Sequence, residues 1–489
     1  MHRLDLTLPH PLHGVAASRH IERAAAAHLP AHTLMRRAGA ATARLAMALV
    51  PHARCIWIAC GPGNNGGDGF EAALELVRRG RPVTVTFDGD AQRLPSDARD
   101  AFDRLRAAGI PLAPEAPVHF DLAVDALLGL GASRAPGGRM HDHLRRMQTS
   151  GAPVLAVDLP SGLDADTGRS AADPGIAGPG RRHCLSLLTL KPGLFTAQGR
   201  DAAGVVWFDE LGADRTGVPP DARLPGRPAP ASRPHDSHKG SFGDVAVIGG
   251  APGMTGAAWL AATAALHAGA GRVFVGLLDD EAPSPAADDA LMRRNPRSLA
   301  LDRMTVVCGC GGGTAVDALL PEVLAHAKSL VLDADGLNAL GRHPGWRELL
   351  QKRAQAHRAT VLTPHPLEAA RLLETDTQAV QADRLAAASK LAHALGCTVV
   401  LKGSGSVIAS PDDCPRINPT GNARLATGGT GDVLAGMVGA ALASGLDPQS
   451  AATQAVWWHG AAADGWPADH PFSASQLARH AGLGLALPA

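Results

Sequence analysis

Short apolar runs alternate with amphipathic stretches through the first half of the chain. The apolar runs cover residues 55–60, 83–87, 121–129, 154–160 and 184–190. They are too short for helices and several are apolar throughout, which is typical of strands in a parallel sheet covered on both faces. Between them, residues 70–80, 97–109 and 141–147 have the spacing of amphipathic helices. The alternation predicts a doubly wound α/β domain.

The same rhythm restarts in the second half. Strands are predicted over residues 244–250, 272–278, 305–310, 329–336, 359–366 and 397–405. Helices are predicted over residues 255–268, 314–327, 379–395 and 431–443. A second α/β domain follows from this pattern, and the lack of a fixed-period repeat argues against a solenoid.

Proline and glycine concentrate between the two halves, in residues 217–240, where no apolar periodicity remains. Such a composition is typical of an interdomain linker with polyproline character. We therefore expect a first domain over residues 1–216, a linker over 217–236 and a second domain over 237–489.

Charge and cysteine content narrow the class of protein. Lys plus Arg and Asp plus Glu both total 46, so the formal net charge is zero, which argues against a nucleic-acid or anionic-membrane partner. No stretch approaches the ~20 apolar residues of a membrane span, and the start lacks the apolar run of a signal peptide. The seven cysteines are scattered without CxxC pairs, which disfavours a disulfide framework and a zinc site. A cytoplasmic protein fits best.

Residues 61–70, GPGNNGGDGF, hold five glycines together with Asn64, Asn65 and Asp68. The stretch is neither a GxxxxGK[ST] phosphate loop nor a GxGxxG fingerprint. Glycines permit close backbone approach, so we interpret the stretch as a ligand-binding loop. The alternative is a tight strand-to-helix turn without chemistry.

Polar residues follow three predicted strands of the first domain. Because ligands of open α/β sheets bind outside the carboxyl ends of the strands, Asn65, Asp125 and Ser161 should share one crevice. Oxygen ligands with a single carboxylate suit a weakly held cation such as K⁺ better than zinc. Asp158 follows the same strand as Ser161. For Asp125 and Asp158, turn formation or helix capping is the alternative.

The second domain carries a sharper signal in residues 427–432, TGGTGD. Unpaired amides at a helix start make an anion site, and Asp432 there could act as a base on a hydroxyl that attacks a phosphoryl group. Residues 402–406, KGSGS, form a second glycine-rich loop, with Lys402 suited to nucleotide phosphates. The alternatives are a capping aspartate and a hairpin turn. His365, between two prolines, would be held rigidly toward a cleft, and a structural role is the alternative for this lone histidine.

These motifs together resemble two known domains in succession. In the first half, GPGNNGGDG, VDALLG and VDLPSGLDADTG are similar to the NAD(P)H-hydrate epimerase domain, which is Rossmann-like. In the second half, HKGSFG, GMTGAA, DADGLNAL, LKGSGS and the stretch from NPTGN to GGTGDVLAG are similar to the ribokinase-like NAD(P)H-hydrate dehydratase domain. The fused order is that of the bifunctional NAD(P)H-hydrate repair enzymes.

The resemblance implies epimerisation of R- and S-NAD(P)H hydrate, then dehydration of the S form with ADP and Mg²⁺, releasing AMP and phosphate. It implies hydrate contacts in the first domain from Asn64, Asn65, Gly66, Gly67, Asp68, Gly129, Leu130, Gly131, Ala132, Ser133, Arg134, Ala135 and Asp158, with Asp158 transferring the proton. It implies K⁺ ligands at Asn65, Asp125 and Ser161. In the second domain it implies hydrate contacts from Ala258, Gly311, His365 and Asp432, with Asp432 catalytic. It implies nucleotide binding by Lys402, Gly403, Ser404, Gly405, Ser406 and Gly431.

Three positions differ from the family pattern. Cys310 and Gly312 stand where the dehydratase loop usually has proline and leucine, and Leu367 stands where glycine usually precedes the glutamate. Two other classes of function remain open, a ribokinase-type small-molecule kinase and a non-catalytic nucleotide-sensing module. We also expect a homo-oligomer.

Overall fold

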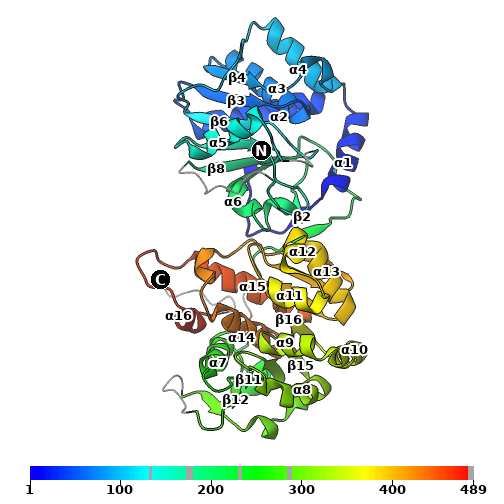
Figure 1. Ribbon diagram of the computed structural model, residues 1–489, viewed down its shortest axis with the longest axis vertical. Coiled ribbons are helices and arrows are strands. Elements are labelled where there is room, and N and C mark those ends of the chain that lie inside the picture. The colour runs from blue at the N-terminus through cyan, green and yellow to red at the C-terminus, as the bar shows by residue number, and fades with distance from the viewer. Residues whose placement is uncertain (132–134, 172–179, 230–233, 283–288, 483–489) are drawn as a thin grey trace. The chain divides into compact units, whose positions relative to one another are not determined.

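The computed structural model describes residues 1–131, 135–171, 180–229, 234–282 and 289–482, and the chain forms two compact units (Figure 1). Unit 1 comprises Met1–Leu6 and His10–Arg223. Unit 2 comprises Thr7–Pro9 and the chain from Leu224 onward. The boundary lies inside the predicted linker, within a short strand, β10 (Ala222–Leu224).

Unit 1 is built on an eight-stranded sheet in the order β1-β9-β8-β7-β6-β3-β4-β5. Its strands are β1 (His2–Arg3), β3 (Ile56–Cys60), β4 (Val83–Phe87), β5 (Leu112–Ala113), β6 (Leu122–Ala126), β7 (Val154–Val157), β8 (Arg182–Leu187) and β9 (Val205–Asp209). Strand β1 is antiparallel to β9, and the other strand pairs are parallel. A further short strand is β2 (His10–Leu12).

Helices cover both faces of this sheet because alternate residues of its strands point to opposite sides. Ile56 and Ile58 pack in the core under α2, α3 and α4, whereas Trp57 and Ala59 pack against α5. The helices are α1 (Val15–Ala27), α2 (Thr33–Leu49), α3 (Asn64–Arg78), α4 (Ser96–Ala107), α5 (Arg139–Thr149) and α6 (Gly199–Ala203).

Unit 2 has parallel strands in the order β13-β12-β11-β14-β15-β16-β17, continued by the antiparallel β18 and β19. Their bounds are β11 (Asp244–Gly249), β12 (Arg272–Leu277), β13 (Leu291–Arg293), β14 (Thr305–Cys308), β15 (Ser329–Leu332), β16 (Thr360–Leu362), β17 (Thr398–Leu401), β18 (Val407–Ser410) and β19 (Asp413–Ile417).

The helices of unit 2 again form two layers. Val245 and Val247 of β11 pack with α7, α14, α15 and α16, whereas Ala246 and Ile248 pack with α8, α9, α11 and α13. The helices are α7 (Thr255–His267), α8 (Leu320–His326), α9 (Asp335–Arg342), α10 (Arg347–Gln355), α11 (Pro366–Leu373), α12 (Thr377–Ala382), α13 (Arg384–Leu395), α14 (Thr430–Ala443), α15 (Pro448–Asp464) and α16 (Ala474–Arg479).

The predicted class, two doubly wound α/β domains, is confirmed. One predicted helix, over residues 379–395, is two helices, because Asp383 has an extended backbone and its side chain caps α13 by accepting from the Ala386 N–H at 2.9 Å. The predicted helix over 314–327 is a 3-10 turn followed by α8.

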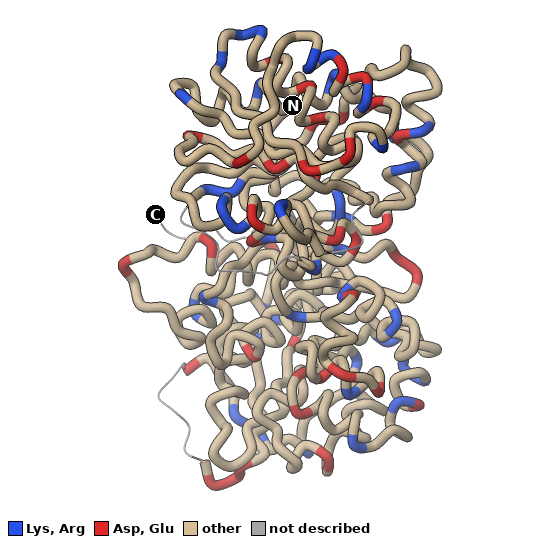
Figure 2. The backbone as a smooth tube through the Cα atoms, turned by 45° about the horizontal axis from the view of Figure 1, so that its top comes forward, with Lys and Arg blue, Asp and Glu red and all other residues tan. Residues whose placement is uncertain are grey.

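Positive and negative residues are interspersed along the backbone of each unit (Figure 2), in keeping with the zero net charge. Within the described part of the chain, no helix combines the length and the apolar character that crossing a membrane requires.

Candidate active sites of the two units

The glycine-rich stretch of unit 1 lies where the winding of the sheet reverses. Strand β3 is flanked by β4 on one side and β6 on the other, and all three are parallel. Ligands of open α/β sheets bind in the crevice outside the carboxyl ends of strands at such a point. The turn from β3 into α3 is therefore the expected place for a site.

Several glycines of this turn are required by packing inside unit 1. A Cβ on Gly61 would lie 1.8 Å from the carbonyl oxygen of Leu127, and one on Gly66 would lie 2.0 Å from that of Gly61. Gly63, by contrast, has nothing within 4 Å of such a Cβ. The glycines thus let α3 approach β3 and the segment after β6, and the backbone contacts to a ligand expected of Gly66 and Gly67 remain a prediction.

The three predicted cation ligands of unit 1 lie close together, as expected from their positions near the ends of three strands. These residues, Asn65, Asp125 and Ser161, are all buried. The Ser161 hydroxyl donates to Asp125 Oδ1 at 2.6 Å, and the Ser161 N–H donates to Asp125 Oδ2 at 2.9 Å. The Leu128 carbonyl accepts from Asn65 Nδ2 at 3.1 Å. Burial raises the pKa of Asp125, which opposes an uncompensated charge at this place.

One atom of this cluster lacks a partner. Asn65 Oδ1 is buried and receives no hydrogen bond from the described residues. A buried polar oxygen of this kind carries a desolvation cost unless something binds it. Together with the Leu128 carbonyl, the Ser161 hydroxyl and one carboxylate, it forms an oxygen set suited to a weakly charged cation.

Asp158, the predicted proton-transfer residue, is held in an unusual backbone conformation with φ of 66°. Its Oδ1 accepts from the fully buried Lys191 ammonium and from the Leu187 N–H at 3.1 Å. Lys191 was not predicted as a site residue. The signal available in the sequence is that it is the only lysine among residues 1–223.

Two further carboxyl groups belong to the surroundings of Asp158. Burial, and then the charge of Asp158, raise the pKa of Asp68 well above its ordinary value. The same two causes raise the pKa of Glu22 on α1. Of the predicted loop 129–135, Ala132, Ser133 and Arg134 lie outside the described residues, and Gly129 lies against Asn65, since a Cβ there would be 3.3 Å from Asn65 Cβ.

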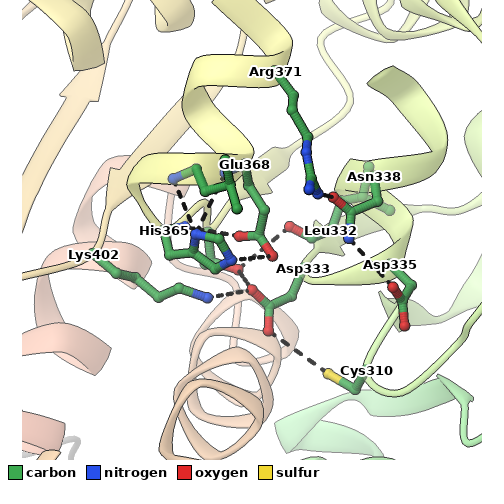
Figure 3. A network of polar contacts seen from close by, with 11 residues as sticks. Cys310, Leu332, Asp333, Asp335, Asn338, His365, Glu368, Arg371 and Lys402 are labelled. Atoms are coloured by element: carbon green, nitrogen blue, oxygen red, sulfur yellow. Dashed lines mark hydrogen bonds and ion pairs between the residues drawn. The ribbon is translucent and has the colours of Figure 1, made fainter. Parts of the chain in front are cut away.

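In unit 2 the site is organised around Asp333, at the end of β15 (Figure 3). Its Oδ1 accepts from Lys402 Nζ at 2.7 Å and from the Thr363 hydroxyl at 2.8 Å. The Cys310 thiol donates to Asp333 Oδ2 across 4.0 Å. Asp333 is 1% exposed and was not predicted as a site residue, although it opens the family motif DADGLNAL.

Asp432 joins this cluster from the first turn of α14. Ligand atoms of Cys310, Asp333 and Asp432 all lie within 4.8 Å of one another. Burial and the charge of Asp333 raise the pKa of Asp432 to about 6. A Cβ on Gly431 would lie 3.4 Å from Lys402 Nζ, so the predicted Lys402, Gly431 and Asp432 are neighbours.

His365 caps α11. Its Nδ1 accepts from the backbone N–H groups of Leu367 at 3.1 Å and Glu368 at 3.4 Å. The proton of the neutral ring is therefore on Nε2, which lies 3.2 Å from Glu368 Oε1. Burial raises the pKa of Glu368 to about 7. Both ring nitrogens of His365 are thus engaged by α11, and Glu368 is a candidate site residue that the sequence did not predict.

The loop 402–406 joins the antiparallel β17 and β18, so its backbone is the hairpin connection considered as an alternative. It also brings Lys402 to Asp333. The buried Arg384 donates to the carbonyl oxygens of Leu401 and Lys402, each at 3.1 Å, and so supports the loop from α13. Of the remaining predicted residues, Ala258 is fully buried and Gly311 has φ of 58°.

Comparison with known proteins covers both units. Residues 31–193 match the family described as "YjeF-related protein N-terminus", and residues 245–481 match "NAD(P)H-hydrate dehydratase". The Bifunctional NAD(P)H-hydrate repair enzyme Nnr of Escherichia coli is 37% identical, over 95% of this chain and 91% of that protein. The ADP-dependent (S)-NAD(P)H-hydrate dehydratase of Neisseria meningitidis is 45% identical over 48% of this chain and 80% of that protein. A solved Bacillus subtilis ADP/ATP-dependent NAD(P)H-hydrate dehydratase is 30% identical, with 52% of this chain and 93% of that chain covered and a TM-score of 0.44.

The fold and the matches define a two-unit α/β enzyme with a mainly parallel sheet in each unit. The chain belongs to the family of bifunctional NAD(P)H-hydrate repair enzymes. The predicted family and enzyme class are confirmed, and neither a kinase nor a nucleotide-sensing module accounts for a match that extends through both units.

Proposed function

We propose that unit 1 of this chain interconverts R- and S-NAD(P)H hydrate, and that unit 2 converts the S form to NAD(P)H with ADP, releasing AMP and phosphate. The observation that carries the proposal is the gathering of Lys402, Asp333 and Asp432 at the start of α14. A helix N-terminus with a lysine beside it suits a phosphoryl group, and the aspartate suits the hydroxyl that attacks it. The name of the Neisseria relative supports ADP as the phosphoryl donor.

The chemistry of unit 2 follows from the poor leaving ability of hydroxide. Asp432 takes the proton of the C6 hydroxyl. The hydroxyl oxygen attacks the β-phosphorus of ADP, and AMP departs. Lys402 and the first N–H groups of α14 stabilise the charge that develops on the phosphoryl oxygens. The C6–O bond then breaks, phosphate leaves, and loss of a proton from C5 restores the ring double bond. The carboxylates of Asp333 and Asp432 fit Mg²⁺, which when bound neutralises phosphate charge.

For unit 1 we propose that Asn65, Asp125 and Ser161 hold K⁺ and that Asp158 exchanges a proton with the hydrate. The unpaired Asn65 Oδ1 supports the first point. The position of Asn64 and Asp68 in the first turns of α3, after the carboxyl end of β3, supports the hydrate contacts assigned to them. In unit 2, Lys402 lies close to Gly431, and this proximity supports nucleotide binding by these two residues.

The whole proposal is tested by supplying purified R- or S-NADH hydrate with ADP, ATP or no nucleotide. We expect the absorbance of NADH to return from both epimers with ADP, together with equal amounts of AMP and phosphate. A stable phosphorylated product would favour the small-molecule kinase, and binding without turnover would favour the sensing module. Dehydration of the S form alone would contradict the function proposed for unit 1.

The potassium proposal has its own test. Asn65→Ala removes the unpaired oxygen, so epimerisation should lose its dependence on K⁺ and slow by about tenfold or more, as loss of about 1.4 kcal/mol implies. The stabilisation of unit 1 by K⁺ in thermal unfolding should vanish with it. Dehydration of the S-hydrate by the same variant is the internal control. Equal wild-type epimerisation in K⁺ and in tetramethylammonium would contradict the proposal.

A further inference from the structure

Lys191 is the most deeply buried cationic side chain of unit 1 that the structure describes, with 0% exposure. Its ammonium donates to Asp158 Oδ1, to the Leu187 carbonyl at 2.7 Å and to the Ser186 hydroxyl at 3.4 Å. These contacts use all three N–H groups of the ammonium. Lys191 therefore has no N–H group left to donate to a bound substrate. Any role of Lys191 in the reaction must act through the residues that it contacts.

Asp158 is the partner whose geometry this arrangement fixes. One carboxylate oxygen, Oδ1, accepts from Lys191 and from the Leu187 N–H, while Oδ2 accepts no hydrogen bond within the described residues. The carboxylate is thus anchored on one side and available on the other. The left-handed backbone of Asp158 sets the direction of its side chain, because few alternatives are open to a non-glycine residue there.

The charges around Asp158 make such an anchor necessary. Glu22 comes from α1, Asp68 from α3 and Cys184 from β8. The carboxyl groups of Glu22 and Asp68 repel the Asp158 carboxylate when they are ionised. The buried ammonium of Lys191 is the attractive partner that holds Oδ1 in place.

We propose that Lys191 is the positioning residue of the epimerisation, holding Asp158 oriented so that Oδ2 can accept the proton of the C6 hydroxyl. The inference rests on the epimerase function proposed for unit 1. As that proton passes to Asp158, the C6–N1 bond breaks, a C6 carbonyl forms, and N1 takes the proton back from Asp158. Rotation about the C5–C6 bond and closure of N1 on the other face of the carbonyl reverse these steps. These reaction steps consume no other reactant.

The test compares Lys191→Met, Asp158→Asn and the double variant Asp158→Asn/Lys191→Met in the full chain, with Lys390→Met as a control of equal charge change on the exposed face of α13. We expect Lys191→Met to lower kcat for R-to-S conversion by about 100-fold or more, with a smaller change in KM. The double variant should be no slower than Asp158→Asn, because the lysine acts through that carboxylate.

Two measurements keep the test decisive if Lys191→Met unfolds unit 1. The double variant leaves no unpaired buried charge and should fold, and Lys191→Ala should regain epimerisation when ethylamine is added. A wild-type rate in Lys191→Met, losses that multiply in the double variant, or no amine rescue in a folded Lys191→Ala would each overturn the inference. Failure of the wild type to epimerise would instead overturn the proposed function. Lys390→Met and the dehydratase activity of every variant should stay at the wild-type level.

Discussion

Three carboxyl groups of unit 2 surround a single ammonium group, that of Lys402. Asp333, Asp432 and Glu368 all influence Lys402, and burial is the largest cause acting on each shifted acid. Burial lowers the pKa of Lys402, but Asp333 and Glu368 outweigh it and the net shift is upward. The ammonium therefore stays charged, as phosphoryl transfer requires.

Asp432→Asn should abolish dehydration and leave epimerisation intact. Loss of a general base costs about 10²–10⁴-fold in rate. In the wild type the base must be ionised, and its pKa is about 6, so the dehydration rate should fall as pH drops through that value. Rates on the S-hydrate between pH 5 and 8 measure both effects. An unchanged rate in the variant would show that another group takes the hydroxyl proton.

Glu368 predicts a pH dependence of stability. Its pKa is raised from 4.5 to about 7 in the folded chain, so the native state holds a proton that the unfolded state releases. The contribution of Glu368 to the unfolding free energy of unit 2 should thus be highest below pH 4.5. This contribution should fall by at most about 3 kcal/mol as the pH rises toward 7. Urea unfolding of Glu368→Gln should show a flatter profile over that window. The exposed Glu348→Gln is the control, and a wild-type slope in Glu368→Gln would contradict the assignment.

The site residues that lie in local sequence motifs could be predicted from the sequence. The residues whose role depends on a partner far away in the sequence could not. Asn65, Lys402 and Asp432 were predicted because each belongs to a glycine-rich run at a strand or helix end. Lys191 pairs with Asp158 across 33 positions, and Asp333 with Lys402 across 69. Such pairs depend on which strands become neighbours in the sheet, and apolar periodicity does not specify that order.

At the scale of elements, the turn between β3 and α3 provides a matched test of glycine function. Gly66→Ala would place a methyl group 2.0 Å from the Gly61 carbonyl oxygen, so backbone must shift. We expect a loss of about 1–3 kcal/mol in the unfolding free energy of unit 1, as for other overpacked sites. Gly63→Ala meets nothing within 4 Å and should change stability by less than about 1 kcal/mol. Equal losses in the two variants, measured by urea unfolding, would refute the packing explanation.

The strands were the most predictable elements, since β4, β11 and β12 fill apolar runs that the sequence displays directly. Helices were less so. The predictions did not include α1, which buries only Ser18 and Ile21 and so carries little apolar stripe. The break before α13 depends on the capping by Asp383, a single residue inside an otherwise continuous helical pattern.

At the scale of the whole chain, composition predicted a linker where the structure has ordered contacts within each unit. In unit 1, Asp221 accepts from the Gly14 N–H at 2.7 Å, and its own N–H donates to the Leu12 carbonyl at 2.9 Å. In unit 2, Leu224 is fully buried and the Arg227 guanidinium lies 5.0 Å from the Trp458 ring centroid. Proline and glycine content does not reveal such contacts, because they involve isolated side chains rather than a periodic pattern.

The last prediction concerns where the chain can be divided. Fragments 1–223 and 224–489 should each fold and keep one activity, epimerisation in the first and dehydration of the S-hydrate in the second, because each unit has its own hydrophobic core. Fragment 1–216 lacks Asp221, and should unfold with about 1–3 kcal/mol less free energy than 1–223, the range for hydrogen bonds to a charged group. Asp221→Ala in fragment 1–223 is the matched control and should reproduce most of that loss. Urea unfolding and the two activity assays measure these outcomes. Inactive fragments on both sides, or equal stability of 1–216 and 1–223, would show that the units are not autonomous or that their boundary lies elsewhere.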